Sequence, residues 1–303
     1  MRNMGCTVET PTFVILNDGR RIEVRTAGPE DGEVLLFHHG TPGAGLPFWP
    51  MVESAAARGL RTVMYSRPGY GNSTVHLNRK IADAASDVAA VIDSLGVQTF
   101  RTVGWSGGGP HALACAAILP DRCLATITIG SIAPYPADGI DWFAGMADEN
   151  VTEFKLALEG ERALVPVLNA SAEAIARMQS TDLPEALGGL LSEVDKPFAA
   201  GEFAEWFSET FRVGFAHGIA GSRDDELALT RDWGFHVADA RFVVIWHGAQ
   251  DRFVPLAHGR WLADHIPGAR RRLFDDEGHL SIIGRMLDRV LDDLLDPAFI
   301  PNH

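Results

Sequence analysis

The sequence has little cysteine and no long apolar run. Cys6, Cys115 and Cys123 are the only cysteines among 303 residues, and no two of them are spaced as C-x-x-C. This number and spacing indicate neither a disulfide framework nor a zinc site, and they fit a reducing, cytoplasmic setting. No stretch approaches the roughly 20 consecutive apolar residues that a membrane-spanning helix needs. We therefore expect a chain without a membrane span.

Positive charge is scarce as well. The chain carries 26 Lys and Arg against 40 Asp and Glu, which gives a formal net charge of -14 at pH 7. No cluster of basic residues offsets this charge, so a phosphate backbone or an anionic bilayer would be repelled. The apolar run at residues 13–16 is shorter than the hydrophobic part of a signal peptide, which takes about 7 to 15 residues. We expect a cytoplasmic protein that binds a small-molecule substrate and no nucleic acid.

Apolar runs that end in glycine-rich loops alternate with amphipathic helical patterns. Two β runs flank Asn17-Asp18-Gly19, which predicts an antiparallel hairpin. Further strands are predicted at residues 34–37, 60–65, 100–104, 124–129, 241–246 and 270–274, and helices at residues 79–95, 107–119, 256–266 and 280–295. This alternation predicts an α/β fold with a mostly parallel sheet and helices on both faces.

The alternation is interrupted between residues 135 and 236, where the periodicity is helical and no β run is clear. We expect a core formed by residues 1–134 and 237–303, with residues 135–236 inserted as a helical cap. Residues 137–236 carry seven Lys or Arg and nineteen Asp or Glu, and so hold most of the negative charge of the chain. The pattern favours a solvated helical surface over a functional acidic rim for cationic ligands.

The motif Gly104-Trp105-Ser106-Gly107-Gly108 lies between a predicted strand and a predicted helix. A sharp strand-to-helix turn forces the central serine into a strained backbone conformation, and side chains two positions to either side would collide. Gly104 and Gly108 meet this requirement. Ser106 would then project at a helix N-terminus, where the Gly107 N–H and the helix dipole stabilise an oxyanion. The motif predicts a serine nucleophile.

A serine hydroxyl needs a base to take its proton, and the base needs an acid that fixes its tautomer. Asp251 and His279 lie in the loops after the last two predicted strands and follow Ser106 in the order that this architecture needs. Rival acids close to His279 in sequence are Asp275, Asp276 and Glu277. Nearness in sequence does not place a carboxylate behind the imidazole ring, so we favour Asp251.

An oxyanion hole needs a second donor, which this architecture supplies from the loop after the third strand. The segment His39-Gly40-Thr41-Pro42-Gly43 occupies that position. We assign the donor to the Thr41 backbone N–H, with Gly40 and Gly43 allowing the loop to approach the substrate.

Five motifs, HHGTPG, SRPGYGNS, GWSGGG, HGAQD and EGH, occur in an order that resembles the α/β-hydrolase fold superfamily. The resemblance implies an eight-stranded sheet with an antiparallel second strand, a helical cap between strands six and seven, and a pocket between cap and core. It implies no metal or organic cofactor. Members that act as epoxide hydrolases or haloalkane dehalogenases use an Asp nucleophile, whereas this chain has Ser106.

We therefore expect a serine hydrolase that cleaves a small carboxylic ester, thioester or lactone through an acyl-enzyme. A second possibility is an aminopeptidase similar to proline iminopeptidases, whose HGGPG loop resembles HHGTPG. Thr41 replaces the middle Gly of that loop, and Gly107 replaces the bulkier residue usual after the serine. A non-hydrolytic lyase and a ligand receptor are also compatible with the same fold.

Overall fold

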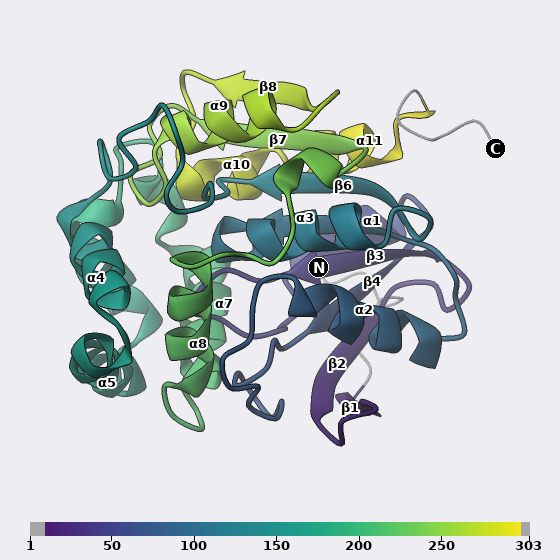
Figure 1. The fold of residues 1–303 in the computed structure, drawn as a ribbon, viewed down its shortest axis with the longest axis horizontal. Coiled ribbons are helices and arrows are strands. Elements are labelled where there is room, and N and C mark those ends of the chain that lie inside the picture. Colours follow the sequence, from purple (N-terminus) through teal and green to yellow (C-terminus); the bar gives the residue numbers. More distant parts are fainter. Residues whose placement is uncertain (1–9, 298–303) are drawn as a thin grey trace.

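An eight-stranded sheet forms the centre of the fold, in the order β1-β2-β4-β3-β5-β6-β7-β8 (Figure 1). The computed structural model describes residues 10–297. The strands are β1 (Thr12–Ile15), β2 (Arg21–Ala27), β3 (Glu33–His38), β4 (Leu60–Tyr65), β5 (Phe100–Trp105), β6 (Cys123–Ile129), β7 (Val243–Gly248) and β8 (Arg270–Phe274). Strand β2 is antiparallel to both of its neighbours, and all other pairs are parallel. The mostly parallel sheet is confirmed.

The predicted hairpin joins β1 to β2, with Ile15 opposite Arg21. Gly19 has a φ of 85°, a left-handed conformation that glycine adopts without the steric cost of a side chain. The inner strands β3 and β5 are buried almost throughout, as their continuous apolar runs predict.

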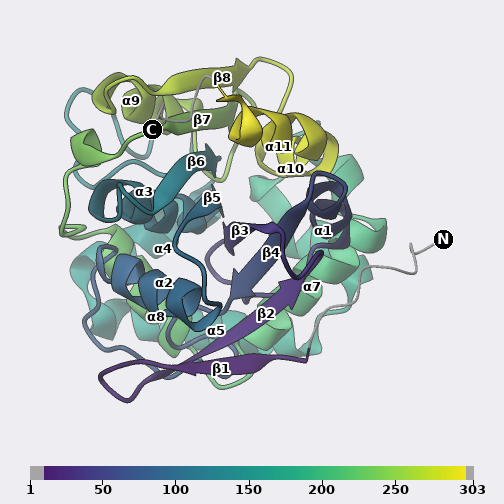
Figure 2. The ribbon, with the colours of Figure 1, turned by 90° about the vertical axis from the view of Figure 1, so that its right-hand side faces the viewer.

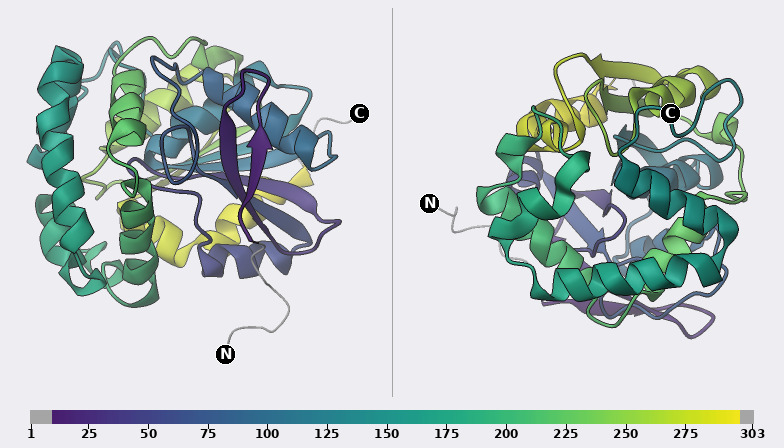
Figure 3. Two further views of the ribbon diagram at one scale, coloured as in Figure 1. Left: turned by 90° about the horizontal axis from the view of Figure 1, so that it is seen from below. Right: turned by 90° about the vertical axis from the view of Figure 1, so that its left-hand side faces the viewer.

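Helices cover both faces of the sheet (Figure 2). One face carries α2 (Asp83–Ser94), α3 (Gly109–Ile118) and α9 (Leu256–His265), and the other carries α1 (Trp49–Ala56), α10 (His279–Arg285) and α11 (Leu287–Leu295). Five further helices lie between β6 and β7 in the chain: α4 (Asp148–Glu159), α5 (Glu161–Arg177), α6 (Leu183–Leu187), α7 (Gly201–Gly214) and α8 (Ala220–Leu229). We call residues 135–236, which contain these five helices, the inserted segment. Figure 3 shows its helices gathered at one end of the sheet.

The C-terminal part of the chain differs from the prediction. The single helix expected at residues 280–295 is two helices, because Met286 leaves the helical conformation with φ -113° and ψ 11°. This break lets α10 pack beside β7 while α11 packs against α1 and β6. Helix α1 was not predicted, since its eight residues give only a short apolar pattern, in which Met51, Val52 and Ala55 are buried.

Cys115 and Cys123 are buried free thiols, whereas Cys6 lies outside the described residues. Within residues 10–297, no helix combines the length and the apolar character needed to cross a membrane.

The central position of β3 predicts where the fold is sensitive. Leu36 is fully buried, whereas Ile15 on the edge strand β1 is 67% exposed. We expect Leu36→Ala to lower the free energy of unfolding by about 2–5 kcal/mol, because it leaves a cavity in a packed core. Ile15→Ala is the matched control and should change it by less than about 1 kcal/mol. Urea unfolding monitored by circular dichroism measures both, and equal losses in the two variants would contradict this assignment of the core.

Candidate active site

The turn at the end of β5 places Ser106 in a conformation that few residues adopt. Ser106 has a φ of 55°, and the single 3-10 turn Ser106–Gly108 leads directly into α3. A Cβ on Gly104 would lie 2.8 Å from Ala112 Cβ, and a Cβ on Gly108 would lie 2.6 Å from the His39 carbonyl oxygen. Real Cβ atoms do not approach other atoms so closely. The structure thus has the strained strand-turn-helix arrangement that the glycine pattern predicts.

His279 and Asp251, predicted from separate loops, lie together. His279 Nδ1 donates to Asp251 Oδ2 over 2.6 Å, and both side chains are buried. The other carboxylate oxygen, Oδ1, accepts the backbone N–H groups of Phe253 and Val254 at 2.9 and 2.8 Å. The Phe253 ring stacks on the imidazole with 4.5 Å between centroids. Asp251 is therefore held so that one oxygen fixes the tautomer and orientation of His279.

The rival acids do not take this place. Glu277 faces Arg285 at 3.6 Å. Among the described residues, the carboxylate that His279 Nδ1 contacts is that of Asp251.

Thr41 and Gly107, the two predicted oxyanion donors, also lie side by side. A Cβ on Gly107 would lie 3.2 Å from the Thr41 backbone nitrogen and 2.7 Å from Thr41 Cβ. The loop after β3 touches the elbow at a second point, since a Cβ on Gly40 would lie 3.5 Å from Ser106 Cβ. Gly43 packs closely against His39 Nδ1, 3.0 Å from where a Cβ would be.

Ser106, Thr41 and Gly107 line a cavity of about 300 Å³ between the sheet and the inserted segment. Most of its walls are apolar, and they include Phe154 on α4 and Phe211 on α7. Such a volume suits a small ligand.

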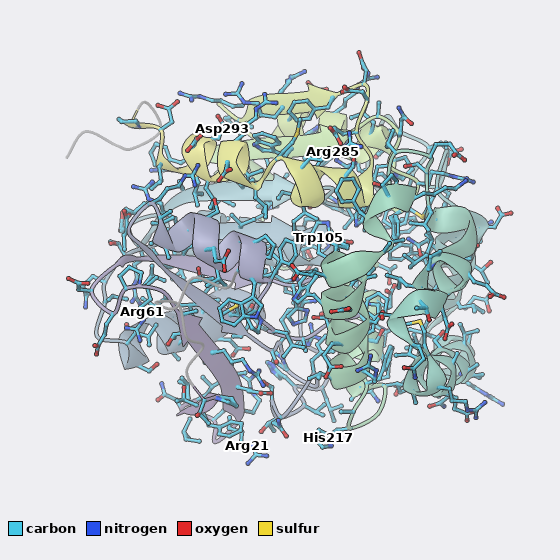
Figure 4. All side chains as sticks on the ribbon, turned by 180° about the vertical axis from the view of Figure 1, so that it is seen from behind. Arg21, Arg61, Trp105, His217, Arg285 and Asp293 are labelled. Carbon is cyan, nitrogen blue, oxygen red and sulfur yellow. The ribbon has the colours of Figure 1, made fainter. Side chains whose placement is uncertain are left out.

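Trp105, next to the serine, joins the core to the inserted helices. Its ring packs against Phe203, Trp206 and Phe207 of α7, and Figure 4 shows it at the junction between the core and these helices. The elbow is therefore packed against α7 as well as against the sheet.

Three glutamates line this mostly apolar cavity: the exposed Glu149, and Glu153 and Glu226, which lie deeper. Glu153 on α4 and Glu226 on α8 both line it, and Glu226 is 5% exposed. Burial and the neighbouring Glu153 raise the pKa of Glu226 well above its usual range, and burial also raises the pKa of Glu153. Among the described residues, Glu226 Oε2 has no hydrogen-bond partner. The sequence pattern did not distinguish these two glutamates from the other acidic residues of the inserted segment.

Two positions that support the His–Asp pair were missed from the sequence. Gly130, at the end of β6, has a φ of 55°, and a Cβ there would lie 2.8 Å from His279 Nδ1. A glycine that directly follows a predicted strand was the available signal. Asp195, in the inserted segment, is fully buried and accepts the N–H groups of His279, Leu280 and Ser281 at 3.0, 2.8 and 2.9 Å. It thus caps the first turn of α10, and no local pattern marks it.

A family model for the alpha/beta hydrolase fold matches residues 33–285. The chain therefore belongs to the alpha/beta hydrolase fold family.

Relatives of the chain include hydrolases and an esterase. The chain is 27% identical over 289 residues to the 2-hydroxy-6-oxononadienedioate/2-hydroxy-6-oxononatrienedioate hydrolase of Cupriavidus pinatubonensis, a match that covers 89% of each chain. It is 28% identical to the pimeloyl-[acyl-carrier protein] methyl ester esterase of Aromatoleum aromaticum, covering 84% of this chain and 94% of that one. With two further curated relatives, the match spans only 63% and 45% of their lengths.

The solved structures agree in fold. The enol-lactonase from Burkholderia xenovorans superposes with a TM-score of 0.64 at 20% identity, covering 93% of this chain and 99% of that one.

The hydrogen bonds from the first turn of α10 to Asp195 predict a measurable effect on stability. Asp195→Asn removes the charge that three backbone N–H groups share, and we expect the free energy of unfolding to fall by about 1–3 kcal/mol. Glu193→Gln is the control, since Glu193 is exposed and pairs with Lys196, and no backbone N–H of α10 donates to it in the described structure. Hydrogen exchange of the α10 amides should accelerate in Asp195→Asn alone. Equal protection of α10 in both variants would refute the capping role.

Proposed function

We propose that this protein is a serine hydrolase that cleaves a small carboxylic ester, thioester or lactone through an acyl-enzyme. The observation that carries the proposal is the 2.6 Å hydrogen bond from His279 Nδ1 to Asp251, in a chain whose Ser106 sits at a strained elbow beside the cavity. The family and its ester-cleaving relative support the same reaction class.

In the proposed mechanism, Ser106 Oγ attacks the acyl carbon while His279 Nε2 takes the hydroxyl proton. Asp251 stabilises the imidazolium, and the N–H groups of Thr41 and Gly107 hold the oxyanion. The tetrahedral intermediate collapses, the bond from the acyl carbon to the leaving oxygen, or to sulfur in a thioester, breaks, and His279 returns its proton to that departing atom. Water then attacks the acyl-enzyme with His279 again as base, which releases the carboxylic acid and restores Ser106. The residues named supply every proton transfer, so no cofactor is proposed.

The inserted segment is proposed to act as a cap that selects the acyl group, because its helices α4, α5, α7 and α8 supply cavity walls. We propose a cytoplasmic setting, which the free thiols of Cys115 and Cys123 fit.

The nucleophile is tested by Ser106→Ala. Initial rates on a short-chain p-nitrophenyl ester should fall by up to about a millionfold, because the triad acts as a unit. Ser86→Ala, an exposed serine on α2, should retain the rate of the parent enzyme. A fluorophosphonate probe should label the parent protein at Ser106 and leave the alanine variant unlabelled. Undiminished turnover in Ser106→Ala would end this mechanism.

A second candidate function is aminopeptidase-like amide cleavage. The observation that favours it is the pair Glu153 and Glu226, which places carboxyl groups in an otherwise mostly apolar cavity. A buried oxygen without a hydrogen-bond partner, such as Glu226 Oε2, is costly, and a substrate ammonium would supply both a donor and a charge that favours the ionised carboxyl group. Against it stand the same departures at Thr41 and Gly107 that distinguish the chain from proline iminopeptidases.

The two candidates separate when the p-nitrophenyl ester and alanyl p-nitroanilide are assayed side by side. If Glu226 binds an ammonium, Glu226→Gln should raise KM for the anilide by about tenfold or more and leave KM for the ester unchanged. Glu159→Gln, on the exposed side of α4, is the control.

The dependence on pH follows from the raised pKa of Glu226. At a pH below that pKa the carboxyl is neutral and attracts no cation, so KM for the anilide should fall as pH rises through it. Above about pH 8 the α-amino group of the substrate loses its proton, so KM for the anilide should rise again there. Parallel pH profiles for anilide and ester would exclude the ammonium site.

A further inference from the structure

One buried carboxylate of the inserted segment reaches into the core beside the candidate oxyanion hole. Asp225, on α8, has no exposed surface, and four side chains contact its two oxygens closely. Arg67 Nη2 and Arg79 Nη1 lie 2.7 and 2.6 Å away, and the hydroxyls of Tyr70 and Thr41 donate over 2.9 and 2.7 Å. We call these five residues the Asp225 cluster.

The charges of the cluster make Asp225 an anion. Burial alone would raise the pKa of Asp225, but the Arg67 and Arg79 guanidiniums hold that pKa well below its usual range. A buried charge is tolerated only where charged partners and hydrogen bonds compensate for lost water, and here both are present. The carboxylate is therefore a fixed acceptor, and the Thr41 hydroxyl has one defined direction in which to donate.

Arg67 connects Asp225 to the backbone of the loop after β3. Its guanidinium donates to the carbonyl oxygens of His39 and Gly40, the latter over 2.9 Å, and to Thr41 Oγ1 over 3.0 Å. His39 donates from Nδ1 to the Gly40 carbonyl at 2.8 Å and accepts the Arg67 backbone N–H at Nε2, 3.2 Å away. Three consecutive residues of the loop are thus fixed by Arg67, whose own position depends on Asp225.

A histidine beside the cluster contacts the second candidate donor, Gly107. His111 on α3 donates from Nδ1 to the Gly107 carbonyl oxygen over 2.8 Å, and its Nε2 lies 3.5 Å from Asp225 Oδ1. Burial and the nearby Arg67 lower the pKa of His111 to about 4, so the ring is neutral at pH 7. A neutral imidazole that donates from Nδ1 has a lone pair at Nε2, so His111 donates no hydrogen bond to Asp225, and among the described residues its Nε2 has no hydrogen-bond partner. The link from Asp225 to the candidate oxyanion donors is therefore its contact with Thr41.

We propose that Asp225 is a positioning residue for the hydrolytic reaction, through which the inserted segment fixes the loop that carries the backbone N–H group of Thr41. The inference rests on the proposed serine-hydrolase function. Charge compensation alone would require only the two arginines. The Thr41 hydroxyl bond and the Arg67 bonds to loop carbonyls connect this charge to the oxyanion loop.

Thr41→Val tests the link while leaving the ion pairs in place, since valine keeps the shape and loses the hydroxyl. We expect kcat on the p-nitrophenyl ester to fall about ten- to a hundredfold with KM within about threefold, because a misplaced donor weakens transition-state binding only. Thr41→Ser, which restores the hydroxyl, should recover at least about tenfold of the loss. A loss confined to KM, or no recovery with serine, would overturn the proposal.

Asp225→Asn tests the carboxylate itself, and Asp224→Asn is the matched control. Asp224 is the adjacent residue on α8, is buried to a similar degree and pairs with Arg223 at 2.8 Å, outside the cluster. We expect kcat to fall at least about a hundredfold in Asp225→Asn and to stay within about twofold in Asp224→Asn. Thermal unfolding checks that both variants are folded. If Asp225→Asn does not fold, Thr41→Val and Thr41→Ser decide the question.

Hydrogen exchange gives a readout that does not depend on turnover. The backbone N–H groups of residues 39–41 and 43 should exchange faster in Asp225→Asn and Thr41→Val than in Asp224→Asn. Unchanged exchange overturns the proposal, and so does faster exchange with undiminished kcat. If the parent enzyme labels with fluorophosphonate but Thr41→Val labels at the same rate, the positioning role fails while the proposed function stands. If the parent neither labels nor turns over ester, the proposed function fails, and with it any role of Asp225 in hydrolysis.

Discussion

The close backbone crossing at the end of β5 constrains everything around the candidate site. The loop after β3, the elbow and the start of α3 meet without side chains between them, since Gly104 and Gly108 leave no room for a Cβ. This contact accommodates the left-handed conformation of Ser106, and it brings Thr41 beside Gly107. Strained conformations persist where the surrounding structure fixes them from several sides. The surrounding elements here include the inserted segment as well as the sheet.

The parts of the fold that depend on local pattern could be predicted from the sequence. Continuous apolar runs marked β3, β4 and β5, and the Asn-Asp-Gly turn marked the first hairpin, because burial and turn conformation are written in adjacent residues. The hydrogen bond between Asp251 and His279 and the strained turn at Ser106 could be expected in the same way, because these residues follow strand ends in a fixed order; their roles in catalysis stay a prediction. The break at Met286 could not be predicted from local pattern. It allows α10 and α11 to pack in different directions, and the helical periodicity of the sequence continues through it.

Contacts between distant residues could not be predicted in this way. Asp195 is 84 residues from His279, and Asp225 is 158 residues from Arg67. In sequence both resemble the many exposed carboxylates of the acidic helices. Most acidic residues of the inserted segment are exposed, whereas these two aspartates are buried, as are Asp224 and Glu226. Their pairing depends on where the inserted segment rests on the core. One aspartate contacts the loop of the predicted base, and the other contacts the loop of a predicted oxyanion donor. The inserted segment thus contacts the loops of the candidate site as well as lining the cavity.

Thr41 and Gly107 are the two positions at which the chain differs from the proline iminopeptidase pattern, and the structure places them in contact. One steric constraint therefore accounts for both differences. The threonine side chain occupies the space that a side chain at position 107 would need. Position 107 has no side chain, and the side chain of Thr41, in the facing loop, fills the space beside it. The sizes of the residues at the two positions therefore depend on each other. In related chains we expect them to covary, with a larger residue after the nucleophile accompanied by glycine in the facing loop. The identity of this pair then decides which of the two facing segments carries a side chain beside the candidate oxyanion donors, and a larger residue at either position alone would crowd the other.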